Sequence, residues 1–213
     1  MYKNINDLKN GNEIFREVKF KDNQKRFKQL IKDGQDPKAL FIGCSDSRFM
    51  PSMITGSNPG DLFVVRNIGN FVAPYKPDED YHATASAIEY AVSVLEIQDI
   101  IVCGHSHCGA IESLYKDIKK SDENTHTLKW LELGQDAKKI AMLTHGKSDK
   151  DTRLRYTEKI SVMNQLENLL TYPAIKRGVE ERKIFLHGWY NDLEKGTIEY
   201  YDDESYEFKL LGE

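Results

Sequence analysis

The chain has 213 residues, 39% of them hydrophobic, and its 30 Lys and Arg stand against 34 Asp and Glu, which gives a net charge of −4. This length and composition predict a globular protein with its own core, organised as one domain over residues 1–213 with a helical arm at 1–34. No apolar run approaches the roughly 20 residues of a membrane span, the first residues lack the apolar stretch of a secretory signal, and the charges form no basic stripe. We therefore expect a cytoplasmic protein without nucleic acid or membrane partners.

Apolar residues at helical spacing predict a helix over residues 11–31, which Gly34 and Pro37 end. Four short apolar runs predict strands that are buried on both faces, as in a parallel sheet. They lie at residues 39–43, 62–65, 100–103 and 183–188.

Helical spacing returns between these strands and after them. The predicted helices span residues 82–95, 110–118, 124–145 and 153–170, and Pro173 opens a further short one. Residues 197–201 and 206–210 resemble an edge hairpin. The order of elements predicts an α/β fold: a mostly parallel central sheet flanked by helices, with an N-terminal helical arm and a C-terminal edge hairpin.

Chemically unusual residues follow two of the predicted strands. Cys44 comes directly after the first, and His105 and Cys108 follow the third. Ligands of open α/β sheets bind beyond the carboxyl ends of strands, so these side chains could meet there. Two thiolates and one imidazole suit tetrahedral Zn²⁺ and leave a fourth position for water or for a carboxylate, for which Asp46 is the candidate.

Each of these residues also has a plainer interpretation. A lone cysteine at a strand end is most often a small buried hydrophobe, and Cys103, inside an apolar run, keeps that interpretation. Cys44 followed by Arg48 could instead be a thiolate nucleophile with a phosphate-gripping Arg. The short, glycine-free spacing between the two argues against that chemistry.

The residues after both strands resemble the signature pair of the β-class carbonic anhydrases. The first element is Cys44-Ser-Asp-Ser-Arg48 and the second is His105-Ser-His-Cys-Gly-Ala110. Similar segments lie at residues 59–70, 87–92 and 187–189, so the resemblance extends over most of the chain. It implies a zinc enzyme that reversibly hydrates CO₂ to bicarbonate, one Zn²⁺ held by Cys44, His105 and Cys108, and a homodimer or a dimer of dimers.

Asp46 and Arg48 are the expected catalytic pair. Asp46 can orient the attacking hydroxide, and Arg48 can hold that carboxylate away from the metal. In the family's accessible site arrangement, the resemblance places substrate-binding residues at Gln35, Phe63, Ile68, Tyr90 and Gly109. The family's closed arrangement, with its inhibitory bicarbonate pocket, has a Trp and a Tyr where this sequence has Phe41 and Asn191, while Arg66 is shared by both. We therefore expect the accessible type.

Two other functions compete with CO₂ hydration. A zinc site with the same ligands could hydrolyse a related linear molecule such as carbon disulfide. Alternatively, the chain could be a noncatalytic interaction module stabilised by zinc, with Asp46 permanently closing the fourth position. His107 is a further candidate for proton release, although a His at that place is more often an exposed residue at a helix start.

Overall fold

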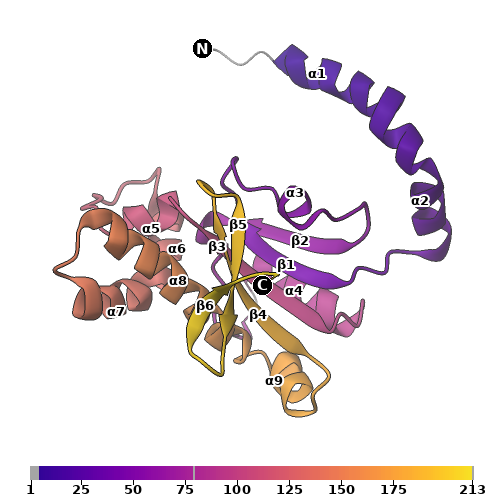
Figure 1. The fold of residues 1–213 in the computed structure, drawn as a ribbon. Helices are drawn as coiled ribbons and strands as arrows, with labels where there is room; N and C mark the ends of the chain where they lie inside the picture. Colours follow the sequence, from indigo (N-terminus) through magenta and orange to yellow (C-terminus); the bar gives the residue numbers. More distant parts are fainter. Residues whose placement is uncertain (1–4, 79, 213) are drawn as a thin grey trace.

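The computed structural model describes residues 5–78 and 80–212. These residues fold around one six-stranded sheet. The strand order is β2-β1-β3-β4-β5-β6, and β1 to β4 run parallel while β5 and β6 are antiparallel additions at one edge (Figure 1). The strands are β1 (Ala39–Cys44), β2 (Leu62–Asn67), β3 (Asp99–His105), β4 (Phe185–Asp192), β5 (Thr197–Asp202) and β6 (Glu207–Leu210). The sheet confirms the predicted class, with the C-terminal hairpin at its edge.

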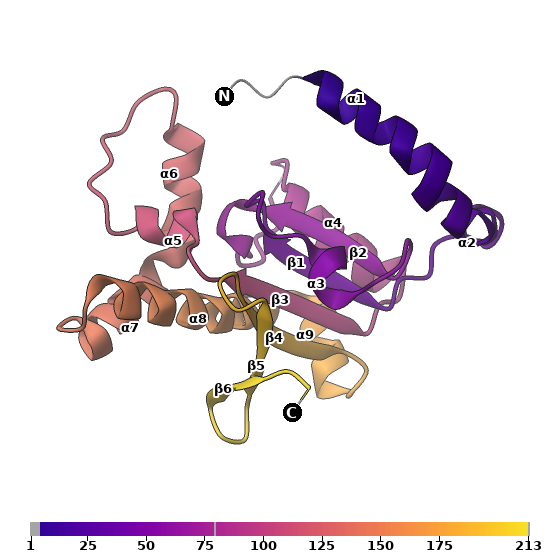
Figure 2. The same ribbon diagram turned by 45° about the horizontal axis from the view of Figure 1, so that its top comes forward.

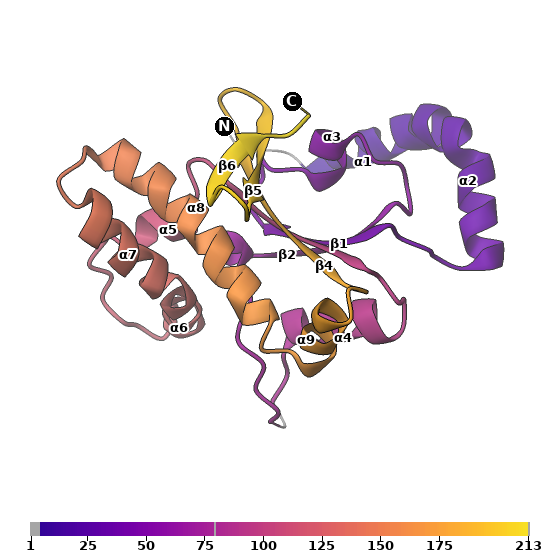
Figure 3. The ribbon, with the colours of Figure 1, turned by 60° about the horizontal axis from the view of Figure 1, so that its bottom comes forward.

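Helices lie on both faces of this sheet. One face is covered by α4 (Ala83–Ser93), α8 (Lys150–Leu169) and α9 (Pro173–Glu180), and the other by the short α3 (Pro51–Thr55), as Figure 3 shows. Beyond the carboxyl ends of the strands lie α5 (Gly109–Ser113), α6 (Thr125–Leu131) and α7 (Gln135–His145). Within the described part of the chain, no helix is long and apolar enough to cross a membrane.

Alternation along the central strands builds two cores. Leu40 and Ile42 of β1 pack toward α4 and α8, whereas Phe41 between them packs against Phe49 and Trp189 on the opposite face. β1 is buried at every residue, and each fully buried Leu, Ile or Phe contributes about 1.5–3 kcal/mol. A third cluster, which includes Cys44, Phe71 and Cys108, fills the carboxyl end of the sheet.

The N-terminal arm leaves the body of its own chain. It consists of α1 (Ile5–Ile14), a π-helical segment η1 (Phe15–Lys19) and α2 (Phe20–Asp33), none of which contains a buried residue (Figures 1 and 2). The base of the arm is fixed by Arg26, whose guanidinium donates to the carboxylate of Asp61 at 3.2 Å. The helical spacing in the sequence indicates a helix over residues 11–31. In the structure the helical arm begins earlier, at Ile5, and projects away from the sheet.

The structure differs from the sequence expectations at four places. The run at 62–65 was expected to be buried on both faces, but β2 is the outer strand and Val64 is 43% exposed, because only β1 pairs with it. The helix α3, which the sequence pattern did not indicate, begins at a proline. The helix expected over 110–118 ends at Ser113, and the expected helix over 124–145 is divided by a 3₁₀ turn at Glu132–Gly134.

Candidate metal centre

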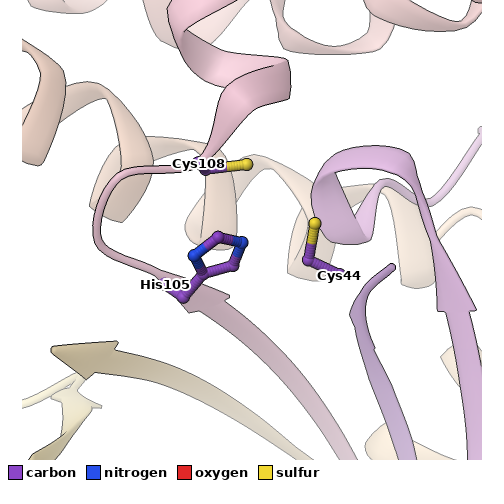
Figure 4. A group of neighbouring side chains, drawn as sticks. All are labelled: Cys44, His105 and Cys108. Atoms are coloured by element: carbon purple, nitrogen blue, oxygen red, sulfur yellow. The ribbon is translucent and has the colours of Figure 1, made fainter. Parts of the chain in front are cut away.

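Cys44, His105 and Cys108 converge at the carboxyl end of the sheet. Their potential ligand atoms all lie within 4.8 Å of one another, and all three residues are buried. Cys44 ends β1, His105 ends the adjacent β3, and Cys108 follows in the loop before α5, so two neighbouring parallel strands bring them together (Figure 4). The structure therefore places the three sequence-predicted metal ligands side by side.

The ring of His105 is oriented as a metal ligand would be. Its Nδ1 donates to the backbone oxygen of Ser106 at 2.8 Å, which leaves a lone pair on Nε2. Nε2 is buried and has no hydrogen-bond partner among the described residues. A buried polar atom without a partner is costly, and a metal ion at this point would satisfy it. Phe49 stacks on the ring at 5.6 Å and restricts its rotation.

The two thiols are prepared to bind a cation. The hydrogen bond from Cys108 is the main cause that lowers the pKa of Cys44 to about 4, and the backbone N–H groups of Asp46 and Gly69 lower it further. The hydrogen bond with Cys44, followed by burial and the negative charge on Cys44, raises the pKa of Cys108. Burial alone would lower the pKa of His105, but the Cys44 thiolate raises it above its ordinary value. One cation in place of the shared protons would relieve this competition.

Gly69 lets the chain approach the Cys44 thiolate. Its φ of 77° lies in the left-handed region, and a Cβ there would come within 2.9 Å of the Ala110 side chain and 2.8 Å of the Phe71 ring. Any other residue would therefore be strained and would push the Gly69 N–H away from Cys44. The turn after β2 thus contributes a thiolate hydrogen bond that only glycine permits.

Asp46 and Arg48 form a two-pronged ion pair beside the cluster. Arg48 Nε donates to Asp46 Oδ1 at 2.9 Å, and Nη2 donates to Oδ2 at 2.7 Å. The Arg48 backbone N–H also donates to Oδ1. These bonds hold the pKa of Asp46 well below its usual range. Both carboxylate oxygens of Asp46 are therefore bound to Arg48.

Arg66 secures the loop that carries Asp46. Its guanidinium donates to the backbone oxygens of Cys44 at 2.8 Å and of Asp46 and Phe49 at 2.7 Å each. Phe41 is fully buried against Phe49 and Trp189, and Asn191 is 1% exposed. These three hydrogen bonds join Arg66 to the backbone of its own chain, so Arg66 stabilises the loop between Cys44 and Phe49.

The expected substrate residues fall into two groups within one chain. Ile68 and Gly109 lie near the cluster: the backbone oxygen of Ile68 accepts from the indole of Trp130 at 2.8 Å, and Gly109 follows Cys108. Phe63 and Tyr90 stack on each other at 5.9 Å near the opposite end of β2. Phe63 pairs with Leu40, four residues before Cys44, so it lies roughly 13 Å along the strand from that ligand.

Gln35 belongs to the distant group. It is exposed in the connection between α2 and β1, before the amino end of the strand that Cys44 ends. A single chain therefore does not bring Gln35, Phe63 and Tyr90 to its own metal ligands. His107 is likewise outside the cluster: it is partly exposed, and its Nε2 pairs with Glu194 at 2.9 Å.

The sequence indicated the role of Cys103 correctly but gave no indication of the contact that Glu158 makes. Cys103 is fully buried in the core on the Phe41 face, and burial raises the pKa of its thiol, in keeping with a packing role. Glu158 was not indicated by any motif, yet its carboxylate accepts from the backbone N–H of Cys108 at 3.0 Å. The available signal was a carboxylate on the face of α8 that also carries Leu154, Ser161 and Val162.

Known proteins resemble this chain in sequence and in fold. A family model described as carbonic anhydrase matches residues 39–198. A carbonic anhydrase of Synechocystis sp. is 37% identical over 93% of this chain and 71% of its own length. One of Pseudomonas aeruginosa is 40% identical over 84% of this chain and 80% of its own length.

Solved structures agree with the sequence relatives. The β-carbonic anhydrase CcaA superposes with a TM-score of 0.90 at 36% identity, over 98% of this chain and 92% of that one. A structure from a study of two tetrameric β-carbonic anhydrases of Sordaria macrospora has a TM-score of 0.72 at 31% identity, over 95% and 94% of the two chains. The chain belongs to the β-class carbonic anhydrases, enzymes that interconvert CO₂ and bicarbonate. This membership supports CO₂ hydration over the carbon disulfide and noncatalytic alternatives.

Proposed function

We propose that this carbonic anhydrase works with one Zn²⁺ per chain, held by Cys44, His105 and Cys108. The observation that carries the proposal is the buried convergence of two sulfur atoms and the unpartnered Nε2 of His105 within 4.8 Å. Two thiolates and one imidazole are a common zinc donor set, and three protein ligands leave one position for chemistry. When bound, Zn²⁺ supplies the Lewis acidity that lets water act as a nucleophile near neutral pH.

Asp46 and Arg48 are the proposed catalytic pair. Asp46, kept ionised by Arg48, accepts a hydrogen bond from the reacting water and so aims its lone pair at the carbon of CO₂. The N–H groups that point at the Cys44 sulfur draw charge from the thiolate, which preserves the acidity that the metal supplies. Arg48 also keeps Asp46 from becoming a fourth ligand.

We assign the site to the accessible type. Phe41 fills the place where a bicarbonate-binding Trp would stand, and Asn191 stands in place of the Tyr. Arg66, the remaining member of such a pocket, spends its hydrogen bonds on three backbone oxygens. These bonds, which use Nε and Nη2, orient Arg66 toward the backbone of its own chain and so support the accessible type.

The substrate pocket is proposed to form between two copies of the chain. β2 is an edge strand, and Val64, Ile68 and Tyr90 are 43%, 48% and 44% exposed. If two copies pair their β2 edges about a twofold axis, the amino end of one strand lies beside the carboxyl end of the other. Gln35, Phe63 and Tyr90 of the second copy would then line the site formed by the metal ligands, Ile68 and Gly109.

The exposed arm supports the same assembly. Its apolar side chains include Ile5, Leu8 and Ile14, each more than 60% exposed, and they need a partner surface to be buried. A second copy offers one on the sheet face that carries Val64 and the exposed α3 residue Met53. A homodimer is therefore the proposed basic unit, and the tetrameric relatives of Sordaria macrospora make a dimer of dimers a further possibility to test.

Subunit complementation tests the shared pocket. Cys44→Ser removes a metal ligand but keeps the pocket residues, whereas Tyr90→Ala keeps the ligands and removes a wall. Neither variant alone should be active, but unfolding and refolding them together at equal amounts should restore roughly a quarter of wild-type CO₂ hydration, since half the dimers are mixed and each has one complete site. A mixture as inactive as its components would contradict the shared pocket.

The pH dependence tests the site type. Stopped-flow CO₂ hydration on protein with measured zinc content should decline gradually from pH 9 to 6.5. A steep collapse across this range would instead indicate the closed type.

We also propose a cytoplasmic location, because all three cysteines are unpaired and two of them are needed as thiolates.

A further inference from the structure

Glu158 is a buried carboxylate directly behind the ligand cluster. It lies on α8 and is 3% exposed. One oxygen, Oε1, accepts from the Cys108 N–H at 3.0 Å and from Arg155 Nη2 at 2.7 Å, while Oε2 accepts from the Tyr190 hydroxyl at 2.8 Å. Three groups from three segments thus fix this one side chain, and its bond to Cys108 reaches the backbone of a proposed metal ligand.

The peptide unit between His107 and Cys108 is held at both of its polar atoms. Its N–H donates to Glu158, and its carbonyl oxygen accepts from Arg48 Nη2 at 2.9 Å. His107 adopts a φ of 60°, a left-handed conformation that costs a non-glycine residue about 1–2 kcal/mol. Because this conformation is unfavourable, the loop depends on such contacts to stay in place.

We propose that Glu158 is a positioning residue for the metal centre. Its carboxylate fixes the plane of the 107–108 peptide, and through that plane it sets the direction of the Cys108 sulfur on one side and the place of Arg48 on the other. Arg48 in turn holds Asp46. The buried interior of α8 is therefore connected to both the ligand set and the catalytic pair.

The hydrogen bond between Glu158 and the Cys108 N–H depends on the length of the Glu158 side chain. A set of conservative variants can separate the effect of this length from the effect of the charge. Glu158→Asp keeps the charge but withdraws the carboxylate by one methylene, so it should lose the Cys108 N–H. Glu158→Gln keeps an acceptor at the original reach. Gln165→Leu is a matched control, because Gln165 is a fully buried polar residue of the same helix that bonds instead to the Val72 N–H.

Zinc affinity, measured by competition with a chromophoric chelator, is the first readout. Glu158→Asp should weaken zinc binding about 10- to 100-fold, as loss of a residue that orients a metal ligand does. Glu158→Gln and Gln165→Leu should stay within about threefold of wild type on the same basis. With saturating zinc, Glu158→Asp should also lower kcat while leaving KM unchanged, because Arg48 and Asp46 shift together.

Two results would overturn the proposal. Equal zinc affinities in Glu158→Asp and Gln165→Leu would make Glu158 a purely structural residue, and an equal loss in Glu158→Gln would show that charge, not reach, is what matters. If Glu158→Asp does not fold, Tyr190→Phe decides, since it frees Oε2 without changing Glu158: weaker zinc binding than in Gln165→Leu supports the role, and equal binding refutes it. This inference rests on the proposed role of Cys108 as a zinc ligand. If the wild-type chain binds no zinc, that proposed role is refuted, whatever the Glu158 variants show.

Discussion

The carboxyl end of the sheet and its β2 edge are completed in different ways. At the carboxyl end, Cys44, His105 and Cys108 are buried. Arg48 and Arg66 donate hydrogen bonds to the loops that carry them, and Glu158 accepts one from the Cys108 N–H. At the β2 edge, apolar side chains remain exposed, and the arm contains no buried residue. The contrast shows that one folded chain assembles the candidate metal ligands by itself, and it supports the proposal that the substrate pocket needs a second copy.

Removing a ligand tests the first half of this contrast and should have the largest effect. Cys44→Ser should lose most of its zinc, and CO₂ hydration should fall to the uncatalysed rate, because a hydroxyl is a poor zinc ligand. Metal analysis and stopped-flow assays measure both. Cys103→Ala is the matched control and should keep one zinc, since Cys103 lies outside the cluster. One zinc per chain in Cys44→Ser would disprove its role as a ligand.

A substitution in the proposed catalytic pair, Asp46 and Arg48, separates the effect on the chemical step from the effect on metal binding. Asp46→Asn should keep its zinc but lower kcat about 100-fold or more, because a neutral amide is a weaker acceptor for the reacting water and loses the ion pair with Arg48 that fixes its orientation. Zinc content and kcat are measured on the same preparation. Asp36→Asn, which alters an exposed carboxylate before β1, is the control and should be unaffected. An unchanged kcat in Asp46→Asn would remove Asp46 from the mechanism.

A charge on the β2 edge tests the second half of the contrast. Val64→Lys should prevent edge pairing, so the chain should sediment as a monomer, keep one zinc and lose at least about tenfold in CO₂ hydration. Leu143→Lys is a matched control, because Leu143 is an 87% exposed residue of α7 far from that edge in sequence. A monomeric Val64→Lys protein with full activity would show that one chain makes the whole pocket.

The fold and the ligand set were predictable because their signals are local. Short apolar runs between helical stretches indicate a parallel sheet, and unusual residues at the carboxyl ends of the adjacent strands β1 and β3 meet at the same edge of it. The outer position of β2 was not predictable, because the run at 62–65 is as apolar as a central strand, and only the absence of a second neighbouring strand exposes Val64.

Other features depend on distant contacts that no local pattern records. Glu158 follows Cys108 by 50 positions in the chain, and its hydrogen bond with the Cys108 N–H forms only because α8 packs beside that loop. The assignment of Gln35 and Tyr90 to one pocket came from resemblance to the family. The structure shows that one chain does not bring these residues to the candidate metal ligands, since they lie toward the amino end of the sheet.

The smallest expected effect concerns the base of the arm, where Asp61 joins the arm to its own chain. Asp61 is 7% exposed, and the backbone N–H of Asn58, followed by Lys38, lowers the pKa of its carboxyl. Asp61→Asn should reduce the free energy of unfolding at pH 7 by about 1–2 kcal/mol, because the charged acceptor is lost. Urea unfolding at fixed protein concentration measures this difference, with Asp36→Asn as the unaffected control.

The pH dependence of that difference has a definite sign. A carboxyl whose folded-state pKa is depressed stabilises the protein above its ordinary pKa of about 4, and this stabilisation disappears as the pH falls through the depressed value. The gap between wild type and Asp61→Asn should therefore narrow on acidification below about pH 4. A gap that stays constant with pH would contradict a stabilising role for the ionised Asp61 carboxylate.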